Sequence, residues 1–145
     1  MRSKVLSTDH ERTFAVIFDA GDEVIAGLTR FAQEQHLSAS RFTAIGAFER
    51  VMLGYFDLEK KDYERIPVEE QVEVLALVGD VALDAGKPKV HAHVVLGLRD
   101  GSARGGHLLE ALVRPTLEVI LTESPGYLKR KFDPASGLAL ITIGS

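Results

Sequence analysis

Apolar and polar positions near the start of the chain follow two different periods, which predict a strand and then a helix. Thr13–Phe18 (TFAVIF) is a short run of β-branched and aromatic residues that ends in the turn-forming residues Asp19-Ala20-Gly21. Helical spacing of apolar residues then extends from about Glu23 to Gln35. The apolar stripe consists of Val24, Ile25, Leu28, Phe31 and Ala32. Asp22 precedes this stripe, so its carboxylate is expected to cap the helix.

Most of the remaining chain has the alternating pattern of strands. Arg41–Phe48 and Val51–Leu58 alternate on either side of Gly46, where we expect a bend or bulge. Glu70–Leu83 is a long extended segment. Its alternation places Val72, Val74, Ala76 and Val78 on one face, and Glu73, Leu75, Leu77 and Gly79 on the other.

Three further strands and the turns between them complete the predicted order. The strands are Lys89–Leu98, Thr116–Thr122 and Leu138–Ile143; the turns are Glu59–Asp62, Gly86–Pro88, Asp100-Gly101 and Ser124–Gly126, and a helical turn is expected at Tyr127–Lys131. One helix followed by many strands predicts an α+β fold with a strongly bent, largely antiparallel sheet. No linker or repeat divides the sequence, so residues 1–145 are expected to form one domain.

Composition narrows the functions that this fold could carry. The net charge is −4, which argues against a protein that acts through nonspecific contacts to nucleic-acid phosphates. The absence of cysteine excludes disulfides and thiolate ligands, so any metal site must use histidine and carboxylate. Met1–Glu11 has no apolar core of a signal peptide, and no apolar run approaches the ~18–20 residues of a membrane span. We therefore expect a cytoplasmic protein without a membrane partner.

Three of the five histidines fall within a short stretch that could bind a metal. His91 and His93 lie two residues apart on a predicted strand and so share a face, and His107 follows a turn. A two-residue turn at Asp100-Gly101 would put His107 opposite Val94, on the wrong face. One extra residue, in a three-residue turn or a bulge at Gly105-Gly106, would instead pair His107 with Val95, beside His93.

The histidine spacing thus predicts a tripod for zinc or another divalent metal, with a one-residue irregularity between Leu98 and His107. The alternative is that His91 and His93 form the polar face of an edge strand and that His107 is a chance neighbour. His10 and His36 are expected to be solvated or to lie at a helix end.

These residues together resemble a known family, the plants and prokaryotes conserved (PPC) domain. The motifs that carry the resemblance are Gly79-Asp80-Val81, Lys87–His93, Asp100-Gly101 and Gly105–Leu108, with Ile45–Phe48 and Gly54–Asp57 upstream and Pro115–Ile120 downstream. The resemblance implies a bent antiparallel sheet, a homotrimer and, as in some prokaryotic members, a metal on His91, His93 and His107. It also implies a fold similar to that of acetolactate decarboxylase. Plant members carry the domain behind AT-hooks, but this chain lacks the Arg-Gly-Arg-Pro core of such a hook.

A metal-dependent enzyme would need further groups beside the tripod. Arg104 could bind a substrate carboxylate, and Glu73, Glu118 and Glu49 are candidate bases, although each could equally belong to a solvated sheet face or a subunit interface. Lys129–Lys131 is the one compact basic run and could contact phosphates. Three functions therefore remain open: a metal-binding protein of unassigned role, a DNA-binding or regulatory module, and a metal-dependent lyase or hydrolase acting on a small carboxylate or keto acid.

Overall fold

Strands make up most of the molecule, and the described residues contain a single helix. The structure, a computed structural model, describes residues 1–7 and 10–143. The elements are β1 (Arg2–Ser7), β2 (Arg12–Asp19), α1 (Val24–Glu34), β3 (Ala39–Asp57), β4 (Asp62–Val68), β5 (Val72–Asp84), β6 (Lys87–Gly97), β7 (Ala103–Glu123), β8 (Lys129–Asp133) and β9 (Leu138–Thr142). All of these strands pair antiparallel except β5 with β8. The predicted α+β class and largely antiparallel sheet are confirmed.

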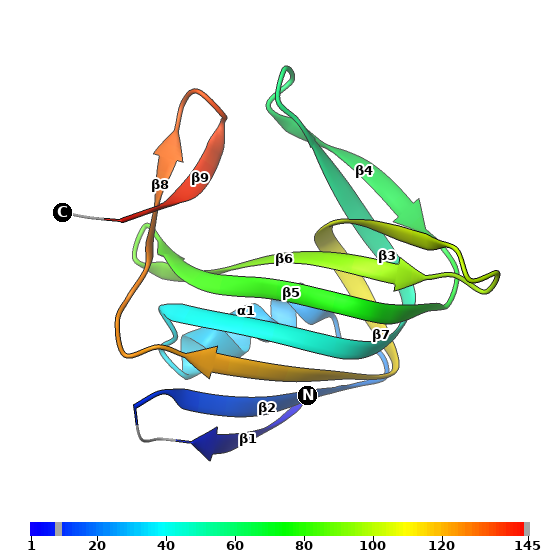
Figure 1. Cartoon of the computed structure of the whole chain (residues 1–145), viewed down its shortest axis with the longest axis horizontal. Helices are drawn as coiled ribbons and strands as arrows, with labels where there is room; N and C mark the ends of the chain where they lie inside the picture. Colours follow the sequence, from blue (N-terminus) through cyan, green and yellow to red (C-terminus); the bar gives the residue numbers. More distant parts are fainter. Residues whose placement is uncertain (8–9, 144–145) are drawn as a thin grey trace.

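Four of the strands close into a ring that carries the rest of the sheet. The main path runs β1-β2-β7-β3-β5-β8-β9, while β6 pairs with both β5 and β7. Because β3 also pairs with both β5 and β7, the order β3-β5-β6-β7 returns to its start. Figure 1 shows β5 and β6 across the middle of the molecule, β1 and β2 below them, and the β3–β4 and β8–β9 hairpins rising above.

Bulges allow the two longest strands to bend between these partners. The β3–β7 ladder shifts register between Gly46 and Phe48, between Phe48 and Arg50, and between Met52 and Leu53. Each shift adds local twist and changes the direction of the strand. As a result, β7 pairs with β6 through residues 103–107 and with β2 through residues 116–123. The sheet curvature expected from the sequence arises at these positions.

The predicted bend at Gly46 lies inside one strand and does not separate two. Ala39–Asp57 is continuous, with a register shift against β5 between Ala44 and Gly46. Gly46 has a φ of +152°, and a Cβ there would lie 2.3 Å from the carbonyl oxygen of Thr116. The backbones of β3 and β7 therefore approach each other at Gly46 more closely than a larger residue permits.

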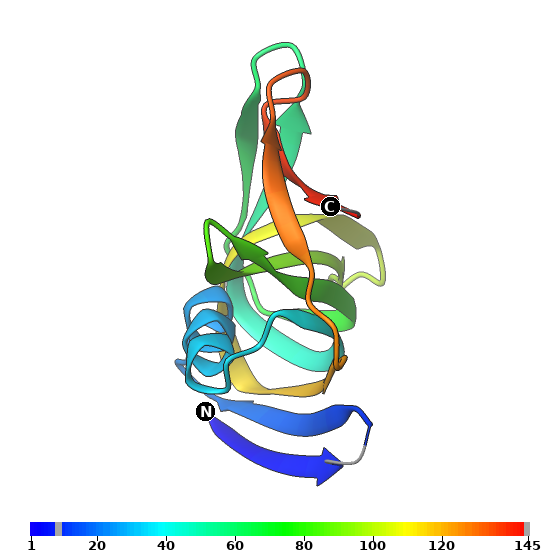
Figure 2. The same cartoon turned by 90° about the vertical axis from the view of Figure 1, so that its left-hand side faces the viewer.

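Helix α1 lies against the curved sheet, as Figure 2 shows from the side, and contacts β6 and β7. Val24, Leu28, Phe31 and Ala32 are buried, whereas Ile25 is partly buried. The rings of Phe14 on β2 and Phe31 meet edge to face, with centroids 5.3 Å apart. The predicted stripe is confirmed.

The predicted cap of this helix was wrong by one residue. Glu23 is the N-cap, and its carboxylate accepts hydrogen bonds from the backbone N–H of Ile25 and Ala26. Its Oε1 also accepts from the N–H of Ala111, 3.1 Å away on β7, so the same carboxylate ties the helix to the sheet. Asp22 instead accepts from the N–H of Asp19 in the preceding turn.

Three other local predictions differ from the structure, each because of how a strand pairs with its neighbours. Residues 62–68 form β4, which the sequence pattern did not reveal and which pairs with the outer half of β3. The helical turn predicted at residues 127–131 is wrong, because Lys129–Asp133 is strand β8. In β5 a bulge between Val74 and Ala76 reverses the alternation, so that Leu77 is buried and Val78 is half exposed.

Membrane insertion has no support from helices in the structure. Within residues 1–7 and 10–143, no helix combines the length and hydrophobicity that crossing a bilayer requires.

Replacement of Gly46 by alanine is expected to destabilise the fold strongly. The new Cβ would meet the Thr116 carbonyl and would hold an L-residue at a positive φ, which together should lower the free energy of unfolding by about 2–4 kcal/mol. Urea unfolding followed by circular dichroism measures this change. Gly126→Ala, where no heavy atom lies within 4 Å of the added Cβ, is the matched control and should change stability by about 0.5 kcal/mol or less. Equal effects of the two substitutions would contradict the close approach at Gly46.

Candidate metal centre

The three histidines singled out from the sequence converge on one another. His91 and His93 lie on the same face of β6, and β7 pairs His107 directly opposite His93. The ring centroids are 5.0 Å apart for His91 and His93, 5.1 Å for His91 and His107, and 5.5 Å for His93 and His107. One nitrogen from each ring can be chosen so that all three lie within 4.8 Å of one another. The imidazoles therefore share one small volume.

The hairpin loop between β6 and β7 brings His107 to this face. The N–H of Leu98 donates to the carbonyl of Ser102 at 2.9 Å, which leaves residues 99–101 as a three-residue loop. Asp100 stabilises the loop, because its Oδ1 accepts from both the N–H and the hydroxyl of Ser102. The predicted extra residue is present in the turn, but it shifts the register in the other direction. His107 consequently lies opposite His93 and not opposite Val95.

No bulge occurs at Gly105-Gly106, and these glycines serve a different purpose. Gly105 pairs with Val95 and Gly106 with Val94 in regular register. A Cβ on Gly105 would lie 2.9 Å from the carbonyl oxygen of Val94, closer than real Cβ atoms approach other atoms. Glycine at this position thus permits β7 to lie tightly against β6 just before His107.

Two aromatic side chains of the β3–β4 hairpin, Phe56 on β3 and Tyr63 on β4, lie on one side of the site. The ring of Tyr63 stacks on the ring of His107, with centroids 4.6 Å apart and an interplanar angle of 29°. Phe56 packs edge to face against Tyr63 at 5.0 Å. Burial raises the pKa of the Tyr63 hydroxyl, so the phenol stays protonated at neutral pH. Tyr63 was missed from the sequence because its position depends on the pairing of β4 with β3.

Burial and mutual repulsion keep two of the imidazoles neutral. Burial, together with the charges of His91 and His93, lowers the pKa of His107 from 6.5 to about 4. Burial and the charge of His91 also lower the pKa of His93. A neutral imidazole has a free lone pair, which is the form that binds metals. Protons therefore compete weakly for His107 at neutral pH.

A carboxylate and a guanidinium flank His91 on the other side of the site. Asp80 lies opposite His91 in the β5–β6 ladder, and its Oδ2 is 3.7 Å from Nδ1 of His91. Arg130 of β8 donates to Oδ1 of the same carboxylate at 2.5 Å. Burial opposes ionisation of Asp80, but the nearby His91 ring and the Arg130 guanidinium outweigh it and lower the pKa of the carboxyl below its usual value.

Of Asp80 and Arg130, only Asp80 could have been predicted from the sequence to lie near His91. Symmetric pairing about the two-residue turn Ala85-Gly86 places residue 80 opposite residue 91, so Asp80 could have been found from turn chemistry. Arg130 could not, because it reaches the site through the parallel contact of β8 with the end of β5.

The donor set fits a metal ion. Nδ1 of His107 is buried and has no hydrogen-bond partner among the described residues. A buried nitrogen without a partner is unfavourable, and a metal ion or proton would satisfy it. Tetrahedral zinc with nitrogen ligands at about 2.0–2.1 Å needs nitrogens about 3.4 Å apart. The nitrogens lie within 4.8 Å of one another, so no pair has to come closer by more than about 1.4 Å to reach that spacing.

The acid–base candidates from the sequence do not gather around the histidines. Arg104 lies three residues from His107 on a regular part of β7 and so faces the opposite side of the strand, where its charge acts on Asp100.

Glu73 lies seven residues from Asp80 along β5, a distance of about 20 Å. Glu73 and Glu118 line a separate open hollow of about 570 Å³. Glu49 forms an ion pair with Arg114 at 3.9 Å.

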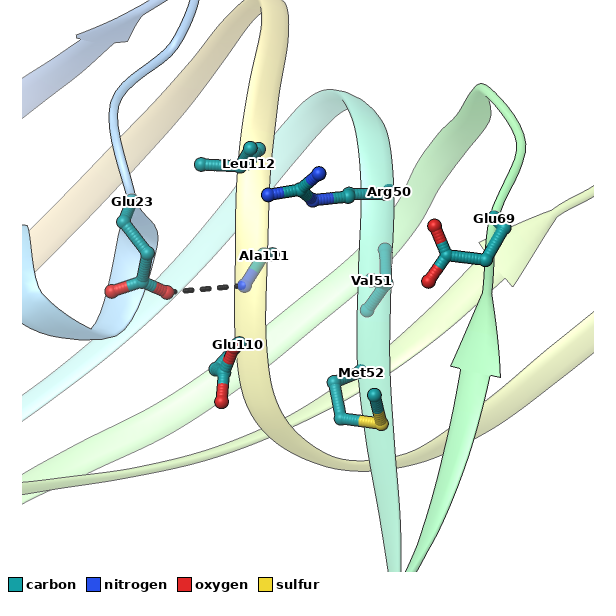
Figure 3. A pocket seen from close by; sticks show the side chains of 8 residues that line it. All are labelled: Glu23, Arg50, Val51, Met52, Glu69, Glu110, Ala111 and Leu112. Carbon is teal, nitrogen blue, oxygen red and sulfur yellow. Dashed lines mark hydrogen bonds between the residues drawn. The ribbon is translucent and has the colours of Figure 1, made fainter.

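A further hollow lies between the start of α1 and strands β3 and β7. It has a volume of about 260 Å³, and Figure 3 shows the residues that line it. The hydrogen bond from Ala111 to Glu23 crosses this hollow, and Glu110 pairs with Arg65 at 2.9 Å. Glu23 and Glu110 thus have structural partners. The histidine cluster is therefore the better candidate for a functional site.

Comparison with known proteins agrees with the resemblance seen in the sequence. The model of the Plants and Prokaryotes Conserved (PCC) domain matches residues 6–125. A plant- and prokaryote-conserved protein from Pyrococcus horikoshii is 35% identical, with 92% of this chain and 93% of that chain covered and a TM-score of 0.86. A metal-containing protein from Archaeoglobus fulgidus is also 35% identical, with 97% and 99% covered and a TM-score of 0.85. No curated protein matches the chain.

More distant structures share the fold. A protein from Ralstonia eutropha described as a "putative DNA-binding protein" is 26% identical, with 90% of this chain and 91% of that chain covered and a TM-score of 0.84. The α-acetolactate decarboxylase of Bacillus subtilis is 14% identical over 87% of this chain and 58% of that chain, with a TM-score of 0.57. The expected likeness to the decarboxylase is confirmed at the level of the fold.

The lowered pKa of His107 makes the stability of the metal-free protein depend on pH. Between pH 6.5 and about 4 the unfolded state binds a proton at residue 107 that the folded state does not, so the free energy of unfolding should fall as the pH falls through this window. Urea titrations in the presence of a chelator measure the decline. His107→Asn removes this difference and should flatten the curve, whereas His36→Asn, at the exposed end of α1, should keep the wild-type decline. Identical curves for wild type and His107→Asn would contradict the assignment.

Proposed function

Because the chain belongs to the Plants and Prokaryotes Conserved domain family, we propose that it is a single-domain protein over residues 1–145 that binds one divalent metal ion. The ligands in this proposal are His91, His93 and His107. The observation that carries it is the convergence of three imidazole nitrogens within 4.8 Å, one ring having a buried Nδ1 without a partner. The metal-containing relative from Archaeoglobus fulgidus, 35% identical over nearly the whole chain, supports the same conclusion.

Zinc is the metal that we propose. Imidazole nitrogen suits zinc, copper, iron and nickel, and a set of three imidazoles without thiolate or carboxylate is a common zinc site in proteins. Zinc held by three protein ligands keeps a fourth position for a small ligand and acts there as a Lewis acid. We propose that this position binds a small molecule beside Tyr63. Arg104, Glu73 and Glu118 are not given a role in the centre, because the first faces away and the other two line a different hollow.

Nucleic-acid binding has weaker support from the chain itself. The basic run at residues 129–131, which the sequence offered as a possible contact to phosphates, lies in β8. Arg130 is buried in an ion pair with Asp80, so this run exposes only Lys129 and Lys131. The net charge of −4 adds to this argument.

We further propose that the protein assembles as a homotrimer through an apolar face of the sheet. Strands β3, β5, β6 and β7 present a group of half-exposed aliphatic side chains on adjoining positions. These are Ile45 (60% exposed), Leu75 (55%), Val78 (51%), Val95 (43%) and Ile120 (47%). Clustered exposed aliphatic residues of this kind mark contact surfaces. Val78 pairs with His93 in the β5–β6 ladder, so the face borders the metal centre.

Removal of any one of the three histidines should abolish stoichiometric metal binding. Wild-type protein equilibrated with zinc and then desalted is expected to retain one zinc per chain, as measured by elemental analysis. His91→Ala, His93→Ala and His107→Ala should each retain far less, because two imidazoles bind zinc much more weakly than three. His36→Ala is the control and should match the wild type. Wild-type protein that retains no zinc would overturn the proposed function.

A charge on the apolar face should break the assembly. Wild-type protein is expected to elute with three times the mass of one chain in size exclusion with light scattering. Val78→Asp should shift the mass to that of a single chain, because the carboxylate would be buried without a partner. Leu58→Asp introduces the same charge at a 66% exposed position in the β3–β4 turn and should leave the mass unchanged. A wild-type protein that is already a single chain in solution would contradict the trimer.

A further inference from the structure

Arg130 is the most deeply buried cation near the histidines. Its side chain is 7% exposed, although its neighbours Lys129 and Lys131 are exposed. Alternation along β8 explains the difference, since residue 130 faces the sheet where the other two face solvent. One guanidinium nitrogen donates to the carbonyl of Ala139 on β9 and another donates to Asp80 on β5. Arg130 therefore connects the C-terminal hairpin to the strand beside the metal centre.

Asp80 stands between this arginine and a metal ligand. Its two carboxylate oxygens face different partners: Oδ1 accepts from Arg130 at 2.5 Å, and Oδ2 lies 3.7 Å from Nδ1 of His91. The second separation is longer than a hydrogen bond. Because Asp80 and His91 are cross-strand partners, the sheet holds their side chains next to each other. Polar contacts at functional sites often tighten when the ligand binds.

The hairpin that carries Arg130 is also held at its far end. Nζ of Lys61, in the turn between β3 and β4, donates to the carbonyl of Pro134 in the turn between β8 and β9 at 2.5 Å. Figures 1 and 2 show both hairpins rising on the same side of β5 and β6. One hairpin brings Tyr63 to His107 and the other brings Arg130 to Asp80. Contacts at base and tip thus fix the guanidinium in place.

Stability alone does not account for this pair. The Arg130 side chain is 7% exposed and that of Asp80 31%, so the guanidinium loses most of its water, and an ion pair withdrawn from solvent often returns no net stability compared with apolar residues of the same size. Metal-binding histidines, by contrast, usually donate their second N–H to a carboxylate, which fixes the ring and the tautomer. Asp80 is placed to accept such a hydrogen bond from His91, and Arg130 holds the other oxygen of the same carboxylate.

We propose that Arg130 is a positioning residue of the metal centre, which acts through Asp80 on His91. Asp80 accepts the Nδ1–H of His91, so that Nε2 of His91 is left as the nitrogen that binds the metal. The proposal rests on the proposed metal-binding function, and it adds that the C-terminal hairpin contributes to the affinity. Sequence pattern gives no sign of this role, because Arg130 reaches Asp80 through the parallel β5–β8 contact, which joins segments far apart in the chain.

The test compares zinc affinity and the tautomer of His91 in matched variants. Asp80→Asn and Arg130→Met are expected to weaken zinc binding by about 10- to 100-fold in competition with a chromogenic chelator. Lys131→Met removes the same charge from the neighbouring exposed position and should bind zinc as the wild type does. Long-range proton–nitrogen NMR spectra of the zinc-loaded wild type should show His91 protonated at Nδ1. The two variants should lose or broaden this signal.

The outcomes separate this proposal from the proposed function. Wild-type protein that binds zinc while His91 carries its proton on Nε2 would overturn the role of Asp80 and Arg130 and leave metal binding intact, and this holds even where a variant fails to fold. Folded Asp80→Asn and Arg130→Met proteins with wild-type affinity would overturn it as well. Wild-type protein that takes up no zinc would instead overturn the function on which the proposal rests.

Discussion

The register of the β6–β7 hairpin is the constraint on which the candidate centre depends. Side chains alternate along a strand, so a slip of one residue would move His107 to the opposite face and separate it from His91 and His93. The three-residue loop at 99–101 sets the register locally. The ring of strands β3, β5, β6 and β7 then holds it, since β6 is paired along both edges and cannot shift against one partner without breaking the ladder with the other.

The same closed arrangement gives the imidazoles their chemical state. Because β4 places Tyr63 over His107 and the neighbouring rings lie about 5 Å away, a proton on His107 would be both poorly solvated and close to like charges. Among the described residues, two buried side-chain nitrogens have no hydrogen-bond partner, and one of them is Nδ1 of His107; the other is Nε of Arg130. Such local strain against the general rule of satisfied polar groups is typical of functional sites, and here it coincides with the ligand set of the proposed metal.

The sequence pattern correctly predicted those features that depend on residues close together in the chain. The helix stripe through Leu28 and Phe31, the histidine strand and the need for one extra residue before His107 all follow from short-range periodicity and turn chemistry, and the structure bears them out. The errors have long-range causes. Glu23, which caps the helix in place of Asp22, also reaches β7, and residues 129–133 form a strand that pairs in parallel with the end of β5. Tyr63 and Arg130 belong to the site for the same reason, so no pattern near the histidines could reveal them.

The ion pair between Asp80 and Arg130 has a consequence for where the working unit of this protein ends. The family match stops at residue 125, whereas β8 and β9 lie at 129–142. A shortened chain that stopped with the match would leave the Asp80 carboxylate beside His91 without its cationic partner. Strands β8 and β9 therefore belong to the folded unit. A domain boundary placed at residue 125 would separate Arg130 from Asp80, which form an ion pair in the folded protein.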